Sequence, residues 1–255
     1  MRSAAPPSCA LSRRALLVTG LVAGCQAALP GLPPLRLSAD QEQELGIRAL
    51  PSLIDAGGGA YPSASVQQAM GEVLRPLAAL ATRSLPWRAL VLDDPAPRLM
   101  AVPGGTILVA RGLVRLAASE DGLVAALAHA LAHLEEAHAA RLEQAASVEG
   151  LIQLVQRGHG PALEAAADQR ARALLVQAGR SPRRAAGLFE VLARVEPEAS
   201  TCLVASAADA SQRSPLWQRP ATAEPPPLAA SPAFQQLKIT FPTPRALPMP
   251  AARIG

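Results

Sequence analysis

Residues 119–138 read SEDGLVAALAHALAHLEEAH, and this stretch decides the fold. Ser119 can serve as a helix N-cap, and Glu120 puts a carboxylate in the first turn, where the helix dipole favours negative charge. His129 and His133 are four positions apart, roughly 40° around such a helix, so both imidazoles can face one tetrahedral metal ion. Two partly buried histidines that share no ligand would show the same spacing. The pair alone therefore leaves both interpretations open.

A second pair of polar residues lies in residues 164–168, EAAAD. The sequence predicts a helix from about residue 162 to residue 178, and a spacing of four puts Glu164 and Asp168 on one face of it. The two carboxylates can belong to a metal site, or they can be solvated acids on a helix surface. This segment is also ambiguous by itself.

The two other histidines of the chain are not expected to join the pair. His138 lies five residues after His133, about 140° around a continuous helix, and so points away from an ion held by His133. His159 stands between Gly158 and Gly160 and is interpreted as a loop residue.

The rest of the chain predicts a fold in which helices dominate. Helix signals and apolar periodicity predict helices at residues 38–53, 65–82, 119–141, 162–178 and 182–195, and extended segments at 87–92 and 100–110. A bend at residues 103–105 divides the second extended segment. Residues 215–255 contain ten prolines and no apolar periodicity. We therefore expect residues 214–255 to be a Pro-rich, largely disordered tail.

Several ordered motifs together resemble one protein family. The family is that of the HtpX-like and CAAX-prenyl-endopeptidase-like zinc metallopeptidases, which are gluzincins, and the likeness is strongest to their small periplasmic lipoprotein members. The motifs are Ser38 to Gly46 (SADQEQELG), Met100 to Leu113 (MAVPGGTILVARGL), Ser119 to His138, and Glu164 to Pro182. The resemblance covers roughly residues 38–200, within a metallopeptidase-like domain expected at residues 38–213.

The resemblance implies an α+β, mainly helical domain with a small sheet and a pair of helices that hold one Zn²⁺. By it, His129, His133 and Glu164 are the zinc ligands, and Asp168 holds a ligating histidine from behind. It also implies that extended polypeptide would pair with an edge formed by the strand Pro103, Gly104 and Gly105.

Ala130 departs from the family pattern, His-Glu-x-x-His, in which the glutamate takes a proton from zinc-bound water. Loss of that acceptor removes a factor of about 10² to 10⁴ for each proton transfer. Glu136 is on a similar face of the helix but about 10 Å along its axis, too far to serve the same water. We therefore expect a zinc-binding protein that binds polypeptide without cleaving it. An active zinc metalloendopeptidase with an atypical base and a metal-free structural or chaperone-like lipoprotein are the alternatives.

The resemblance also indicates a second catalytic change, after the ligand helix. Members of the family often carry a histidine and an arginine there, which help to stabilise the oxyanion. Arg219 can match the arginine, whereas Arg213 stands where the histidine is expected.

The N-terminal residues predict export to a bacterial envelope. Arg13 and Arg14 precede a short apolar run, and small residues before Cys25 resemble a bacterial lipobox. We expect residues 1–24 to be a signal peptide and residues 25–37 to be a lipidated Cys25 with a Pro-rich tether. Gln26 favours the outer membrane, with the domain on the periplasmic face. An ordinary signal peptide or an uncleaved anchor is the alternative.

Composition excludes one class of partner. The net charge of +4 falls to +1 once the three arginines of the first 24 residues are removed, and aromatics make up only 2% of the chain. A nearly neutral domain offers no basic surface for nucleic acid. Cys202 has no cysteine partner left for a disulfide and is interpreted as a small buried residue.

Overall fold

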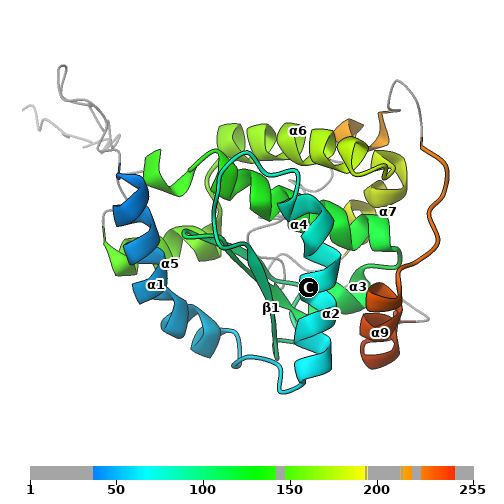
Figure 1. Cartoon of the computed structure of the whole chain (residues 1–255), viewed down its shortest axis with the longest axis horizontal. Coiled ribbons are helices and arrows are strands. Elements are labelled where there is room, and N and C mark those ends of the chain that lie inside the picture. Colours follow the sequence, from blue (N-terminus) through cyan, green and yellow to red (C-terminus); the bar gives the residue numbers. More distant parts are fainter. Residues whose placement is uncertain are drawn as a thin grey trace, which may run out of the picture. The chain divides into compact units, whose positions relative to one another are not determined.

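The computed structural model describes residues 37–141, 147–192, 194, 213, 215–219 and 225–244, all within one compact unit of residues 34–255. Figure 1 shows helices around a small sheet. The helices are α1 (Ala39–Ala56), α2 (Ala64–Ala78), α3 (Arg111–Leu116), α4 (Glu120–Glu135), α5 (Val148–Arg157), α6 (Pro161–Gln177), α7 (Pro182–Leu192), α9 (Pro232–Thr240) and the 3-10 turn η1 (Ala139–Arg141). The strands are β1 (Arg88–Leu92), β2 (Leu99–Val102) and β3 (Thr106–Ala110). The predicted α+β, mainly helical fold is confirmed.

Helix α4 lies at the centre of the structure, and every one of its 16 residues is buried. Its many alanines allow close approach of α2, α6, α7 and the sheet, all of which pack against it. Because the helix is enclosed, any polar side chain on it needs a partner from a neighbouring element. The polar ring nitrogens of the two histidines on α4 therefore need partners within the protein.

The C-terminal end of α4 comes earlier than its sequence predicts. The helix ends at Glu135, and Ala137 takes a left-handed conformation with φ of 49°. The backbone N–H of Ala137 donates to Leu134 and that of His138 to His133, at 3.3 and 3.0 Å. This pair of bonds is the Schellman arrangement that closes a helix. Sequence reasoning missed it because the left-handed position carries alanine instead of glycine.

The sheet has the order β1-β3-β2, with β1 parallel and β2 antiparallel to β3. The amide of Gln67 covers the outer edge of β1, where it accepts a hydrogen bond from Val91 N–H and donates to Val91 C=O. Strand β2 forms the other edge. In the antiparallel pair of β2 and β3, Met100 lies opposite Leu108, and Ala110 N–H donates to Arg98 C=O. Because hydrogen-bonded positions alternate along such a pair, the backbone groups of Leu99 and Ala101 point away from β3.

Pro103, Gly104 and Gly105, which were expected to form the strand edge that pairs with substrate, do not lie in a strand. Pro103, Gly104 and Gly105 form the turn between β2 and β3, with φ of 90° and 92° at the two glycines. The turn packs against α1 so closely that a Cβ on Gly46 would lie 1.9 Å from the Pro103 carbonyl oxygen. The sheet edge beside α4 is instead the outer side of β2, at Leu99 and Ala101, which precede this turn in the chain.

The C-terminal segment also departs from expectation. Residues 225–244 contain α9, which begins with Ser231 as N-cap and Pro232 in the first turn. Phe234, Leu237 and Phe241 join the main core, and α9 packs beside α2 (Figure 1). The expectation of a largely disordered tail is wrong for this part, because the prolines obscured a short helix with ordinary start signals.

None of the helices that the structure describes is long and apolar enough to span a bilayer.

Candidate metal centre

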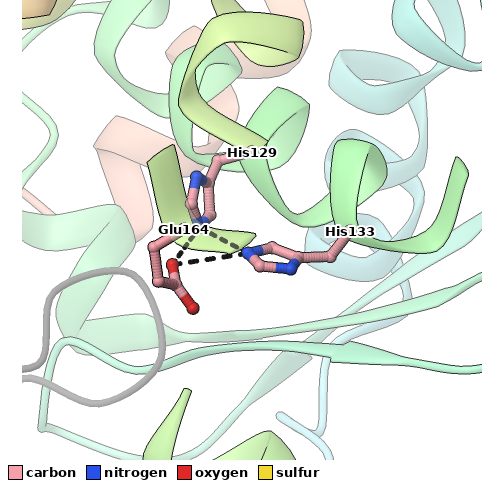
Figure 2. Close-up of side chains that lie close together, drawn as sticks. All are labelled: His129, His133 and Glu164. Carbon is pink, nitrogen blue, oxygen red and sulfur yellow. Dashed lines mark hydrogen bonds and ion pairs between the residues drawn. The ribbon is translucent and has the colours of Figure 1, made fainter. Parts of the chain in front are cut away.

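Three side chains from two helices converge at one point (Figure 2). His129 and His133 come from α4, and Glu164 comes from the first turn of α6. The Nε2 atoms of the two imidazoles are 3.1 Å apart. Glu164 Oε2 lies 3.1 Å from His129 Nε2 and 3.4 Å from His133 Nε2. All three residues are buried.

This geometry fits a tetrahedral zinc ion. Ligand atoms bound at about 2.0–2.2 Å in a tetrahedral arrangement lie about 3.3–3.6 Å apart. In addition, Glu164 Oε2 is a buried oxygen that accepts no hydrogen bond within the described part of the chain. A buried carboxylate oxygen without a hydrogen bond is costly unless a cation is bound there. The donor set of two imidazole nitrogens and one carboxylate oxygen is one that zinc prefers.

Asp168 and Arg213 hold His129 from behind. Asp168 Oδ1 lies 2.9 Å from His129 Nδ1. Arg213 donates to both oxygens of Asp168, at 2.6 and 2.7 Å. Since Asp168 can only accept, the proton of His129 sits on Nδ1 and the lone pair of Nε2 faces the cluster. This is the tautomer that a metal ligand requires.

The remaining two histidines lie against the same cluster. His138 Nδ1 is 2.9 Å from His133 Nδ1. The ring of His159 stacks on that of His133 with centroids 4.1 Å apart, and its backbone N–H donates to Glu164 Oε1. Sequence reasoning placed both residues outside the site. The available signal was the Gly-His-Gly sequence around His159, since Gly158 and Gly160 take φ of 90° and 88°, which other residues rarely adopt.

The electrostatics of the two ligand histidines differ. Burial lowers the pKa of His129, but the adjacent carboxylates of Asp168 and Glu164 outweigh this effect, so the pKa lies above its ordinary value. Burial lowers the pKa of His133 to about 3. Burial alone would raise the pKa of Glu164, yet its contacts with His129, His133 and His159 bring it well below the usual range. The carboxylate is therefore ionised and one imidazole is neutral before any ion binds.

Ala130 faces a small cavity beside this cluster. The cavity measures about 10 Å³ and is lined by Leu99, Ala101, His129, Ala130, His133, Val155 and His159. That is about the space of one water molecule. The nearest acid along α4, Glu135, instead accepts hydrogen bonds from Thr82 and Arg170, so its carboxylate is not available to a water in the cavity.

Of the two arginines after the ligand helix, the structure places Arg213, and not Arg219, beside the cluster. Arg219 is exposed, and its backbone carbonyl accepts a hydrogen bond from Arg172. Its side chain has no contact with the cluster in the part of the chain that the structure describes. Arg213 is buried, 3.3 Å from His129 Nδ1 and 3.8 Å from Glu164 Oε2. Cys25 and Cys202 lie outside the described residues.

Comparison with known proteins agrees with the resemblance. Residues 62–178 match the model of peptidase family M48. The mitochondrial metalloendopeptidase OMA1 of Schizosaccharomyces pombe is 38% identical over 72 residues. Those residues are 28% of this chain and 21% of that relative, so the likeness spans about a fifth of its length. The matched family segment contains all three residues of the cluster.

Proposed function

Since residues 62–178 form a peptidase family M48 segment, we propose that the protein is a zinc-binding member of that family that does not hydrolyse peptide bonds. His129, His133 and Glu164 hold the ion. A zinc ion there would polarise a carbonyl group and lower the pKa of a bound water. The chain's own residues must accept and return the protons.

Ala130 is the observation that carries the proposal. Its methyl group occupies the position of the proton acceptor, and the cavity beside it has room for about one water molecule. Glu135 is engaged with Arg170 and Thr82. Hydrolysis of a peptide bond needs a base that takes a proton from the attacking water and then an acid that gives a proton to the leaving amine. Loss of the acceptor therefore slows two steps.

Zinc content and peptidase activity test the proposal together. We expect the purified protein to hold one zinc per chain after dialysis and to leave unfolded casein intact. His133→Ala should lose the zinc, whereas the matched control His159→Ala should keep it. A wild-type protein without zinc, or zinc-dependent cleavage of casein, would contradict the proposal.

His159 supports a second candidate function, an active metalloendopeptidase with an atypical base. Its imidazole lines the same cavity as Ala130, and an imidazole can act as a general base. If the wild type cleaves casein and His159→Ala abolishes the cleavage while zinc stays bound, this candidate replaces the first.

Polypeptide binding at the edge of β2 is the second part of the proposal. Leu99 and Ala101 turn their outer backbone groups away from β3, and these groups have no hydrogen-bond partner in the described segments. Such an edge can add an extended peptide as a further strand. Ala101→Pro removes one outward N–H without touching the β2–β3 bonds. We expect it to weaken binding of a fluorescent unfolded peptide, while Ala101→Val should not.

We also propose that the chain is an envelope lipoprotein anchored at Cys25, on the periplasmic face and in the outer membrane. The support is the lipobox-like sequence before Cys25. Radiolabelled palmitate fed to bacteria that express the full chain should label the wild type and not Cys25→Ala. Equal labelling of the two proteins, or none, would contradict it.

A further inference from the structure

We infer that His138 is a positioning residue for His133, in the way that Asp168 is for His129. The inference rests on the metal site proposed above and adds a residue behind the second ligand. His138 is buried and lies next to the Nδ1 atom of His133. Each imidazole of the pair on α4 would then have its own hydrogen-bond acceptor on the side away from the ion.

The hydrogen-bond geometry fixes which ring donates. The Nδ1 atoms of His133 and His138 are 2.9 Å apart, and the rings meet edge to face at 78°. Two ring nitrogens at this distance share one proton. His133 must present the lone pair of Nε2 to the ion, so its proton is on Nδ1. His138 Nδ1 is then the acceptor, and the proton of His138 is on its own Nε2.

The turn after α4 places His138 where this bond can form. On a continuous helix, His138 would point about 140° away from His133. The left-handed Ala137 reverses the chain, and the bond from His138 N–H to the His133 carbonyl folds the residue back on the same ligand. Left-handed alanine is uncommon. His133 and His138 are thus joined by two hydrogen bonds, one between their backbones and one between their rings.

The role of His138 differs from that of a fourth ligand. The atoms within reach of a common ion are those of His129, His133 and Glu164 among the described residues, and His138 meets His133 on its far nitrogen. An acceptor in this place holds the ring orientation and the tautomer that coordination needs. Because the acceptor is an imidazole and not a carboxylate, it orients His133 without adding negative charge.

Two substitutions separate the acceptor from the bulk of the ring. His138→Phe keeps a ring and removes the acceptor, and we expect it to weaken zinc binding by about 10- to 100-fold. His138→Asn presents a carbonyl oxygen near the position of Nδ1 and should keep zinc affinity close to that of the wild type. Zinc affinity is measured by competition with a chromophoric chelator, and thermal unfolding in EDTA checks that each variant folds.

Proton NMR of the zinc-loaded protein supplies a signature that general destabilisation would not change. The Nδ1–H proton of His133 should exchange slowly in the wild type and in His138→Asn, and rapidly in His138→Phe. Unchanged affinity in His138→Phe, or equal weakening in both variants, would overturn the inference alone. Failure of the wild type to bind zinc would instead overturn the proposed function.

Discussion

Asp168 and Ala130 show how single residues set the properties of this site. Asp168 is fully buried and ionised, because Arg213 and His129 outweigh the effect of burial and hold its pKa below the ordinary value. Ala130 is equally buried but offers only a methyl group to the cavity. Asp168 keeps the ring of His129 oriented, whereas Ala130 leaves the site without a proton acceptor.

Asp168→Asn keeps the shape of the side chain and removes its charge. Arg213, only 9% exposed, would lose the carboxylate that holds it most closely. Removal of one partner of a buried ion pair costs about 3–5 kcal/mol. We expect the free energy of unfolding of the metal-free protein in urea to fall by about 3 kcal/mol, since Glu164 remains nearby. Asp168→Asn combined with Arg213→Met should recover part of the loss, and an unchanged single variant would contradict this account.

Ala130→Glu tests how closely the cavity is packed. A cavity of about 10 Å³ cannot hold a carboxyethyl group, and overpacking a core costs about 1–3 kcal/mol. We expect the single variant to unfold at lower urea concentration than the wild type. His159→Ala in the same chain opens the cavity and should reduce the cost, so that the two substitutions are not additive. Strict additivity would show that the new side chain does not meet His159.

At the scale of elements, α4 is held at both ends by buried ion pairs. Its first turn carries Glu120, which accepts hydrogen bonds from Arg180 and from Ser231 of the C-terminal segment. At its last turn, Glu135 accepts from Arg170. Both ends of the helix that supplies two ligands are thus tied to segments far away in sequence.

Glu135 should make stability depend on pH. Burial raises its pKa, but hydrogen bonds from Arg170 and Thr82 outweigh this and bring the pKa below its ordinary value. A carboxylate with a lowered pKa in the folded state stabilises above its unfolded pKa, and this stability is lost as pH falls through the folded pKa. In urea titrations with EDTA, Glu135→Gln should be less stable than the wild type at pH 7, with a smaller difference at about pH 3. A difference that stays constant would contradict the pairing.

Helix α9 offers a matched pair of substitutions for its role in the core. Leu237 is fully buried, whereas Ile239 on the same helix is 76% exposed. Leu237→Ala should lower the free energy of unfolding by about 2–5 kcal/mol. Ile239→Ala should change it by about 0.5 kcal/mol or less. Similar effects of the two substitutions would show that α9 is not packed as described.

The elements that sequence could predict are those with their own local signals. Ser119 before an acidic first turn defines the start of α4, and Gly179 marks the end of α6. Helices α3 and α5 were not predicted, and two further departures lie where local signals mislead. Ala137 closes α4 without a glycine, and the prolines around α9 hide a helix that packs against α2 and whose Phe234 joins the main core.

At the scale of the whole molecule, the match of residues 62–178 to peptidase family M48 agrees with the resemblance, and the three predicted ligands meet in space. The spacing of His129 and His133 is local, and Glu164 follows from the order of motifs. His138 and His159 could not be predicted in the same way. Their places depend on backbone turns that bring residues of different elements onto one imidazole, and helical spacing does not encode such contacts.

The most direct test of the account is a crystal of the zinc-loaded protein with diffraction data collected on both sides of the zinc absorption edge. We expect a single anomalous peak at about 2.0–2.2 Å from His129 Nε2, His133 Nε2 and Glu164 Oε2, with His138 outside the coordination sphere. No peak at this point, or a peak bound by other side chains, would contradict the account.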